Sequence, residues 1–235
     1  MELDYDFMAK TLWVILQSVP VTLKLTAVSL AVAIPFSFFM ALARIYEVKG
    51  IKPLVQLYVS FIRGTPMVLQ ILVVYSLMPS LLNSVVKTFG WQIKVFDVDP
   101  IFYAYIVFTL NTMALLSEVF RSALLSLADG QMEAGLSIGM SYFQIYRRIL
   151  IPQALVSALP NLCNLTVNLM KNTSLAFLMT VKEVTATGKI AASFGYNYIE
   201  AYIDVFLVYL VLCAVTQLAF HWAEQRLGVF QRLKY

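Results

Sequence analysis

The stretch EAGLSIGMSYFQIYRRILIP, residues 133–152, lies between two long apolar segments of the chain. It carries a glutamate and two arginines, so it is too polar to lie in lipid. Its pattern still predicts helix, because Glu133 falls in a first turn, where a carboxylate is favoured. Gly139 can end that short helix, and Ser141 can cap a second one. The stretch therefore predicts two short helices with a glycine break, a compact shape that can fit a groove on a partner.

The composition is that of a membrane protein. The chain has 235 residues, of which 60% are hydrophobic and 13% charged, and its mean hydropathy is +0.79. Soluble domains average about 45–50% apolar and about 25% charged residues, so a soluble globular domain is excluded. The net charge of +4 is interpreted as basic cytoplasmic loops and not as a nucleic-acid-binding surface. His221 is the one histidine and the two cysteines lie in apolar surroundings, so no metal site, catalytic residue or cofactor of this chain is expected.

Five apolar segments are expected to cross the bilayer, in which a spanning helix needs about 20 residues. Residues 1–19 are expected to form an interfacial helix, after which Pro20 opens the first span. The spans are expected at residues 21–43, 67–82, 101–124, in the segment that follows Pro152, and at 202–222. A short helix that re-enters the membrane or lies at the outer surface is expected within residues 181–197. The fold class is therefore all-α integral membrane, with residues 1–235 as one transmembrane domain.

Loop charges predict the orientation. Arg44, Lys49 and Lys52 follow the first span, and basic residues also follow the last one. Because basic loops stay on the cytoplasmic side, both positions are expected to be cytoplasmic. With five spans, this places the polar loop of residues 127–152 and the C-terminus in the cytoplasm and the N-terminus outside.

The polar stretch resembles the EAA loop of the permease subunits of bacterial ABC importers, whose pattern is E-A-A, three residues, G, nine residues, I-x-L-P. Gly135 stands here for the second alanine and Ile151 for the leucine. In that family the loop is the coupling helix that docks on the ATPase subunit. The resemblance thus implies these ATPase-coupling residues: Glu133, Ala134, Gly139, Ile145, Arg147, Ile149 and Pro152. The alternative is a cytoplasmic loop with two surface helices and no such role.

A second similarity lies before the second span. YVSFIRGTPMVLQ resembles the "RGTP" segment of the polar amino-acid permeases, a subfamily of the same importers. Gly64 and Pro66 allow a bend there, and Arg63 supplies a cation at the cytoplasmic membrane edge. These three residues are therefore expected to have a structural or gating role.

The third span carries charge as well. Glu118 and Arg121 are three residues apart on one helical face, so they can pair near the inner surface. NTMALLSEVFRSAL is similar to the segment that leads into the EAA loop in the family. A structural ion pair is favoured over substrate contact, and Asn111, nearer mid-span, is the better candidate for lining a pathway.

The fourth span carries a polar stripe, because its asparagines recur at steps of three and four. Such a stripe should face protein or a water-filled cavity, and it can either line a substrate pathway or join helices by hydrogen bonds. LMKNTSLAFL resembles a K-D/N-T-S-L-A segment of the family, in which Asn172 takes a place often held by aspartate. Because asparagine carries no charge, it supplies no counter-charge to Lys171, and the partner of Lys171 stays open. The candidate pathway residues here are Asn161, Asn164, Asn168, Lys171, Asn172, Thr173 and Ser174.

The chain lacks a phosphate-binding GxxxxGK[ST] loop, so the energy for transport must come from another chain or from an ion gradient. The resemblance implies a MetI-like permease fold in the bacterial cytoplasmic (inner) membrane. It also implies three partners: two copies of an ABC ATPase that uses ATP and Mg, a second permease subunit in a homo- or heterodimer, and an extracytoplasmic substrate-binding protein. It implies a transport subunit, not an enzyme, that passes a polar amino acid by alternating access. The alternative is an ion-gradient-driven secondary transporter with Glu118 and Lys171 in a relay.

Overall fold

The computed structural model describes residues 3–127 and 130–232, and these form helices connected by short loops. Within these described residues, five helical runs are long and apolar enough to cross a membrane, which confirms the number of spans expected from the sequence. They are α1 (Tyr5–Ile45), α3 (Met67–Thr88), α4 (Pro100–Leu125), the run Tyr142–Met179, and α9 (Tyr198–Arg232). The shorter elements are α2 (Ile51–Gly64), η1 (Val95–Asp97), α5 (Gln131–Ser137) and α8 (Val184–Ser193).

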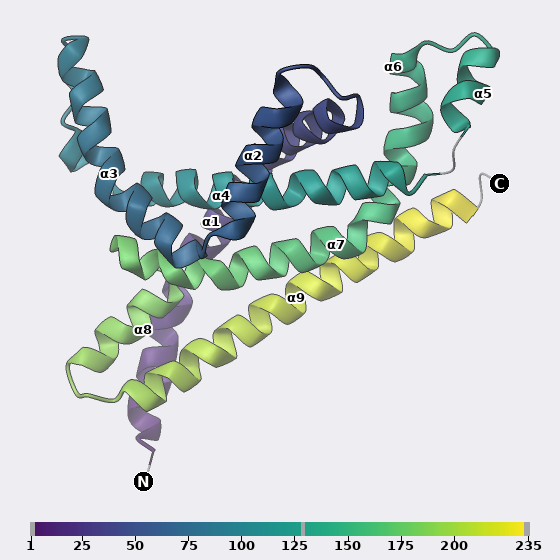
Figure 1. The fold of residues 1–235 in the computed structure, drawn as a ribbon. Helices are drawn as coiled ribbons and strands as arrows, with labels where there is room; N and C mark the ends of the chain where they lie inside the picture. Colours follow the sequence, from purple (N-terminus) through teal and green to yellow (C-terminus); the bar gives the residue numbers. More distant parts are fainter. Residues whose placement is uncertain (1–2, 128–129, 233–235) are drawn as a thin grey trace.

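The run Tyr142–Met179 consists of four consecutive helical pieces. They are α6 (Tyr142–Ile145), the π-helical turn η2 (Tyr146–Leu150), α7 (Ile151–Asn172) and the 3-10 helix η3 (Thr173–Met179). In Figure 1, α4, α7 and α9 lie side by side, with α5, α6 and the end of α9 at one end of the bundle. Residues 130–152, here called the coupling segment, mark that end, and α8 lies at the opposite end.

One boundary differs from the sequence-based expectation. The structure has a single 41-residue helix α1 that runs through Pro20, so the helix start expected at that proline is wrong. Packing explains the continuity, because Ile15 before the proline and Thr22 after it are both fully buried on the same helix. Ile15 packs with Val184 of α8 and with α9, and prolines are tolerated in membrane helices whose neighbours support them. The interfacial location of residues 1–19 remains a prediction.

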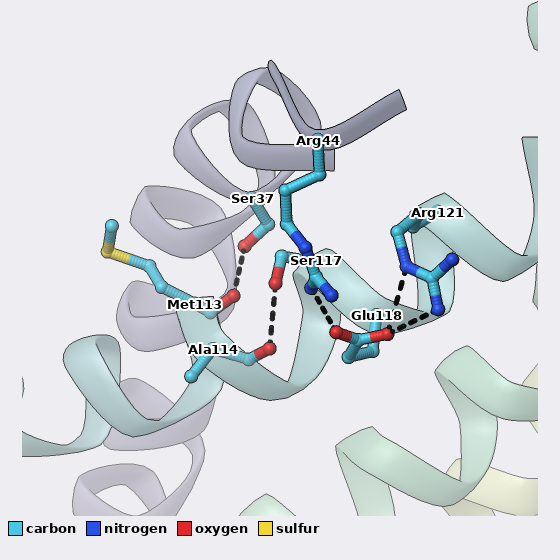
Figure 2. Close-up of polar contacts among 7 residues, drawn as sticks. All are labelled: Ser37, Arg44, Met113, Ala114, Ser117, Glu118 and Arg121. Atoms are coloured by element: carbon cyan, nitrogen blue, oxygen red, sulfur yellow. Dashed lines mark hydrogen bonds and ion pairs between the residues drawn. The ribbon is translucent and has the colours of Figure 1, made fainter. Parts of the chain in front are cut away.

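Small side chains bring α1 close to α4. Ala33 and Ala41 of α1 are fully buried and pack with Leu116 and Phe120 of α4. Between them, the Ser37 hydroxyl donates to the Met113 carbonyl at 3.1 Å, as Figure 2 shows. Small residues allow such close approach in membranes, where helices associate through packing and hydrogen bonds. The α1–α4 pair therefore forms the centre of the bundle.

The helix expected within residues 181–197 is present as α8, and a buried carboxylate begins it. Glu183 is fully buried and accepts hydrogen bonds from the backbone N–H groups of Thr185 at 2.7 Å and Ala186 at 2.8 Å. The Tyr209 hydroxyl of α9 donates to the same carboxylate at 3.0 Å. Burial raises the pKa of Glu183 to about 7, against these hydrogen bonds, which lower it. Glu183 thus caps α8 and links it to α9.

A pH dependence of stability follows from this raised pKa. The folded protein holds the Glu183 proton more tightly than the unfolded chain, whose carboxyl titrates near the ordinary value of 4.5. The contribution to the free energy of unfolding is complete below that value and is lost as the pH rises through about 7. We expect the melting temperature to fall more steeply between about pH 5 and about pH 8 in the wild type than in Glu183→Gln. Thermal unfolding in detergent measures both profiles, and parallel profiles would contradict this assignment.

Candidate functional site

The coupling segment has the two-helix form expected from its sequence. α5 ends before Gly139, whose φ of +81° is a conformation that favours glycine. Ser141 then caps α6, because its hydroxyl accepts from the Gln144 N–H at 3.3 Å while the Gln144 side chain accepts from the Ser141 N–H at 2.8 Å. The break at Gly139 and the cap at Ser141 are thus confirmed.

One contact holds the two short helices together. Ile145 of α6 is fully buried and lies against Gly135 of α5. A Cβ added at Gly135 would lie 2.7 Å from Cγ1 of Ile145, so an alanine there would require the Ile145 side chain or one of the two helices to shift. The glycine that replaces the second alanine of the EAA pattern thus allows the close approach of Ile145 in this chain. It also means that Ile145, expected to contact the ATPase, packs inside the segment and positions its outer residues.

Most of the residues expected to couple to the ATPase lie on the surface of the coupling segment. Glu133, Ala134, Gly139, Arg147 and Pro152 are exposed, and Ile149 is half-buried. Two exposed apolar residues were not expected from the sequence. These are Ile138 and Phe143, which are 77% and 71% exposed. Apolar residues exposed among polar ones are typical of interaction surfaces, and only their exposure in the fold distinguishes them from core residues.

Hydrogen bonds tie the coupling segment to the membrane helices. The Tyr146 and Tyr46 hydroxyls lie 2.6 Å apart and connect η2 to the end of α1. The Gln131 and Gln153 side-chain amides bond to each other in both directions at 3.0 Å, which connects the start of α5 to α7. The segment is therefore linked to α1, and its first helix is also held against α7, the span into which the segment continues.

An ion cluster joins α1 and α4 (Figure 2). Arg121 donates to Oε2 of Glu118 from Nε at 3.1 Å and from Nη2 at 3.0 Å, so the pair expected from the three-residue spacing is confirmed. Arg44 of α1 donates to the other oxygen of the same carboxylate. From the sequence Arg44 was interpreted only as a loop charge. Its place in the last turn of α1 gave no sign that it reaches α4.

The fourth-span stripe opens onto a cavity of about 260 Å³ between α4 and α7. Asn111, Asn161, Asn168 and Asn172 line it together with Arg63 and Glu118, and we call it the amide cavity. Asn111 also donates to Oε1 of Gln70 at 3.0 Å. Within residues 3–127 and 130–232, the α7 asparagines make no side-chain hydrogen bond to another helix, so they do not join helices of this chain. Their amides are left free to meet a ligand, water or a partner.

Other members of the expected pathway set lie elsewhere. Asn164 and Lys171 are exposed on α7 but do not line the amide cavity, and Ser174 is half-buried. Thr173 is fully buried, and its hydroxyl donates to the Met170 carbonyl at 2.6 Å, so it supports the turn into η3. The ion pairs of the described residues do not include Lys171, whose partner therefore stays open.

The RGTP residues form the bend that the sequence predicts. α2 ends at Gly64, and α3 begins at Met67 directly after Pro66. The Gln70 amide donates to the Ile62 carbonyl at 2.9 Å and to the Thr65 hydroxyl at 2.8 Å, which holds the bend in place. The sequence analysis did not single out Gln70, although it also binds Asn111.

A second polar cavity, of about 660 Å³, lies against α1, α2 and α4. Its lining includes Arg44, Gln56, Ser60 and Gly64, and we call it the arginine cavity. It shares Arg63 and Glu118 with the amide cavity, so the two cavities meet at these side chains. Glu118 is neutralised by its two arginines, whereas none of the ion pairs found in the described part of the chain includes Arg63. An anionic group passing here would meet an uncompensated cation.

A helical bundle of five spans with an exposed two-helix segment and polar cavities between its spans defines the membrane subunit of a transporter. The family described as "Binding-protein-dependent transport system inner membrane component" matches residues 33–229, and the chain belongs to this family. It is the permease subunit of an ABC importer, whose ATPase is a separate subunit and whose substrate arrives on a binding protein. EAA-loop coupling and alternating access are general features of this family.

Relatives and solved structures agree with this assignment. The chain is 37% identical over 213 residues to "Probable amino-acid permease protein YxeN" of Bacillus subtilis (strain 168), covering 91% of each chain. It is 34% identical to the "L-cystine transport system permease protein TcyL" of the same organism, covering 88% of this chain and 84% of the relative. An amino acid ABC transporter crystal structure matches with a TM-score of 0.79 and 26% identity over 96% of this chain and 100% of that one. The inward-facing MetNI methionine transporter matches with a TM-score of 0.69 and 18% identity. The match covers 92% of this chain and 96% of that one, and it supports the MetI-like fold.

The ion cluster generates a stability prediction. Glu118→Gln leaves Arg44 and Arg121 without their carboxylate, and these side chains are only 15% and 33% exposed. Breaking a buried pair costs about 3–5 kcal/mol, so this partly exposed cluster should lose about 2 kcal/mol of unfolding free energy. The solvent-accessible Lys52–Glu47 pair at 2.5 Å is the control, and Lys52→Ala should leave the free energy of unfolding nearly unchanged, because water screens this pair. Denaturant unfolding in detergent measures both, and equal losses would show that the cluster does not join α1 to α4.

Proposed function

We propose that this chain passes a polar amino acid across the bacterial cytoplasmic membrane, with its N-terminus outside and its coupling segment and C-terminus in the cytoplasm. The observation that carries this proposal is the meeting of the amide and arginine cavities at Arg63 and Glu118. Along α4, this junction lies between Asn111 and the coupling segment. The two cavities thus form a polar route that leads from mid-span toward the cytoplasmic end.

The chemistry of the route suits an amino acid. Every free amino acid carries a carboxylate, and Arg63 offers it a guanidinium with five donors and no competing carboxylate among the ion pairs of the described residues. The asparagine side chains both donate and accept, so they can replace the water around an ammonium group and a polar side chain. The printed names of the relatives, amino-acid and L-cystine permeases, support the same class of substrate.

The remaining pathway residues have a place in an assembled pore. Asn164 and Lys171 are exposed on α7, and an exposed polar face within a membrane should meet protein or water. A second permease subunit, identical or homologous, would cover this face and enclose the route between the two subunits. Thr173 and Ser174 would then support the end of the stripe.

The coupling segment supplies the link to ATP. Glu133 and Arg147 on its exposed surface, with Phe143 between them, would dock in a groove of the ATPase, one segment for each of two ATPase copies. ATP with Mg, bound by the ATPases and not by this chain, would draw the two segments together. Rigid-body movement of the attached helices then switches the pore between its two openings.

Replacement of Glu133 tests this role. In proteoliposomes that contain the permease, its ATPase and its binding protein, Glu133→Ala should lower both uptake and substrate-stimulated ATP hydrolysis about tenfold, as loss of an interface hot spot does. Membrane insertion should not change. Glu47→Ala is the control, because this carboxylate is also exposed but lies outside the coupling segment.

Uptake of each of the standard amino acids by the wild-type complex identifies the substrate in the same assay. Uptake that continues without ATP and stops with an uncoupler would contradict the proposal and favour the gradient-driven transporter. The structure disfavours that mechanism, because Glu118 is held between two arginines and is therefore a poor proton carrier.

A further inference from the structure

A third cavity lies at the end of the bundle opposite the coupling segment, between α3, η1, the start of α4 and the loop before α8. It has a volume of about 890 Å³, within the range of about 300–1,000 Å³ that small-molecule sites occupy. We call it the distal cavity. Its polar lining includes Tyr75, Ser76, Asp97, Asp99, Thr180 and Lys182.

The distal cavity carries charges of both signs. Lys182 and Asp97 are exposed, and the ion pairs of the described residues include neither of them. Asp99 has a local role, since it accepts the Ile101 N–H at 2.9 Å at the start of α4. Lys182 is therefore available to a carboxylate and Asp97 to an ammonium group. A zwitterion is the small ligand that satisfies both.

A short segment of chain separates this cavity from the amide cavity. Asn172 lines the amide cavity and Thr180 lines the distal cavity, and η3 lies between them. Ala176 and Met179 of η3 are fully buried in the largest apolar cluster, together with Phe108 of α4. The two cavities are thus on opposite sides of a packed apolar layer, and a polar solute cannot cross that layer in this conformation.

The geometry of η3 suits a part that moves. η3 ends the helical run Tyr142–Met179, and a 3-10 helix has poorer hydrogen-bond geometry than an α-helix, so its turns are held less tightly than those of α7. Thr180, which follows it, has a φ of +60°, an uncommon conformation for a residue other than glycine. Its hydroxyl lies 3.4 Å from that of Tyr75, at the border between η3 and the distal cavity.

We propose that the distal cavity binds the zwitterionic head of a free amino acid, with Lys182 at the carboxylate and Asp97 at the ammonium group, before the amino acid passes η3 into the amide cavity. This site deepens the proposed function and depends on it. It adds a second substrate position, on the far side of the apolar layer from the amide cavity.

Uptake kinetics test the two charges. In the same proteoliposomes, Lys182→Gln and Asp97→Asn should each raise the KM for the amino acid that the wild type transports about tenfold, the effect of losing one charge-assisted hydrogen bond of about 1.4 kcal/mol. Uptake at saturating substrate and ATPase activity without substrate should stay within about twofold. Lys87→Gln is the matched control, because this lysine is exposed on α3 and does not line the cavity. An unchanged KM in both cavity variants would overturn the site.

Labelling of a cysteine tests occupancy directly. Ser76→Cys, in a chain with Cys163 and Cys213 replaced by alanine, should react with a membrane-impermeant maleimide added from outside. The transported amino acid should slow this reaction several-fold, whereas its methyl ester, which lacks the carboxylate charge, should not. Ser193→Cys on α8 is the control, because Ser193 is exposed but does not line the cavity.

The outcomes separate this site from the proposed function. Failure of the wild-type complex to take up any amino acid would contradict the proposed function itself. Normal uptake without protection of the cysteine would overturn the distal site alone. Protection by the binding protein without amino acid, and not by the amino acid, would make the cavity a protein-docking surface and also overturn the site. Reaction only from the cytoplasmic side would overturn it as well.

Discussion

The pairing of Glu118 with arginines from two helices is the constraint on which the arrangement of the polar cavities depends. A charged side chain among membrane spans is costly unless it is paired, and here one carboxylate takes both Arg44 of α1 and Arg121 of α4. This brings the end of α1 against α4 and leaves Arg63 outside the cluster. Arg63 lines both polar cavities and takes part in none of the ion pairs of the described residues, which is the property on which the proposed carboxylate contact rests.

One continuous helical run, Tyr142–Met179, connects the two ends of the molecule. The run Tyr142–Met179 begins in the coupling segment, passes the amide cavity and ends in η3 beneath the distal cavity. Its π-helical turn η2 is a departure from α-helix of a kind that is frequent at functional sites, and the 3-10 helix η3 ends the run. A continuous helical backbone therefore joins the coupling segment to η3, and the Tyr46–Tyr146 contact joins the segment to α1.

Several parts of the site were predictable because they depend on local chemistry. The break at Gly139 and the Glu118–Arg121 pair follow from spacing within one helix or turn, and both are present. Arg44 could not be assigned to Glu118, because the two residues are 74 positions apart and only the packing of α1 on α4 brings them together. The start of a new helix at Pro20 was wrong for a similar reason, since contacts with α8 and α9 keep α1 continuous.

The sequence by itself determined the membrane class, the five spans, the two-helix coupling segment and the polar stripe, because hydropathy and helical periodicity depend on residues close together in the chain. Tertiary structure alone decided which stripe residues share a cavity, that Ile145 is buried while Phe143 is exposed, and that η3 separates two polar cavities. These properties belong to contacts between helices distant in sequence. A periodic pattern shows which face of a helix is polar, but only packing shows what that face meets.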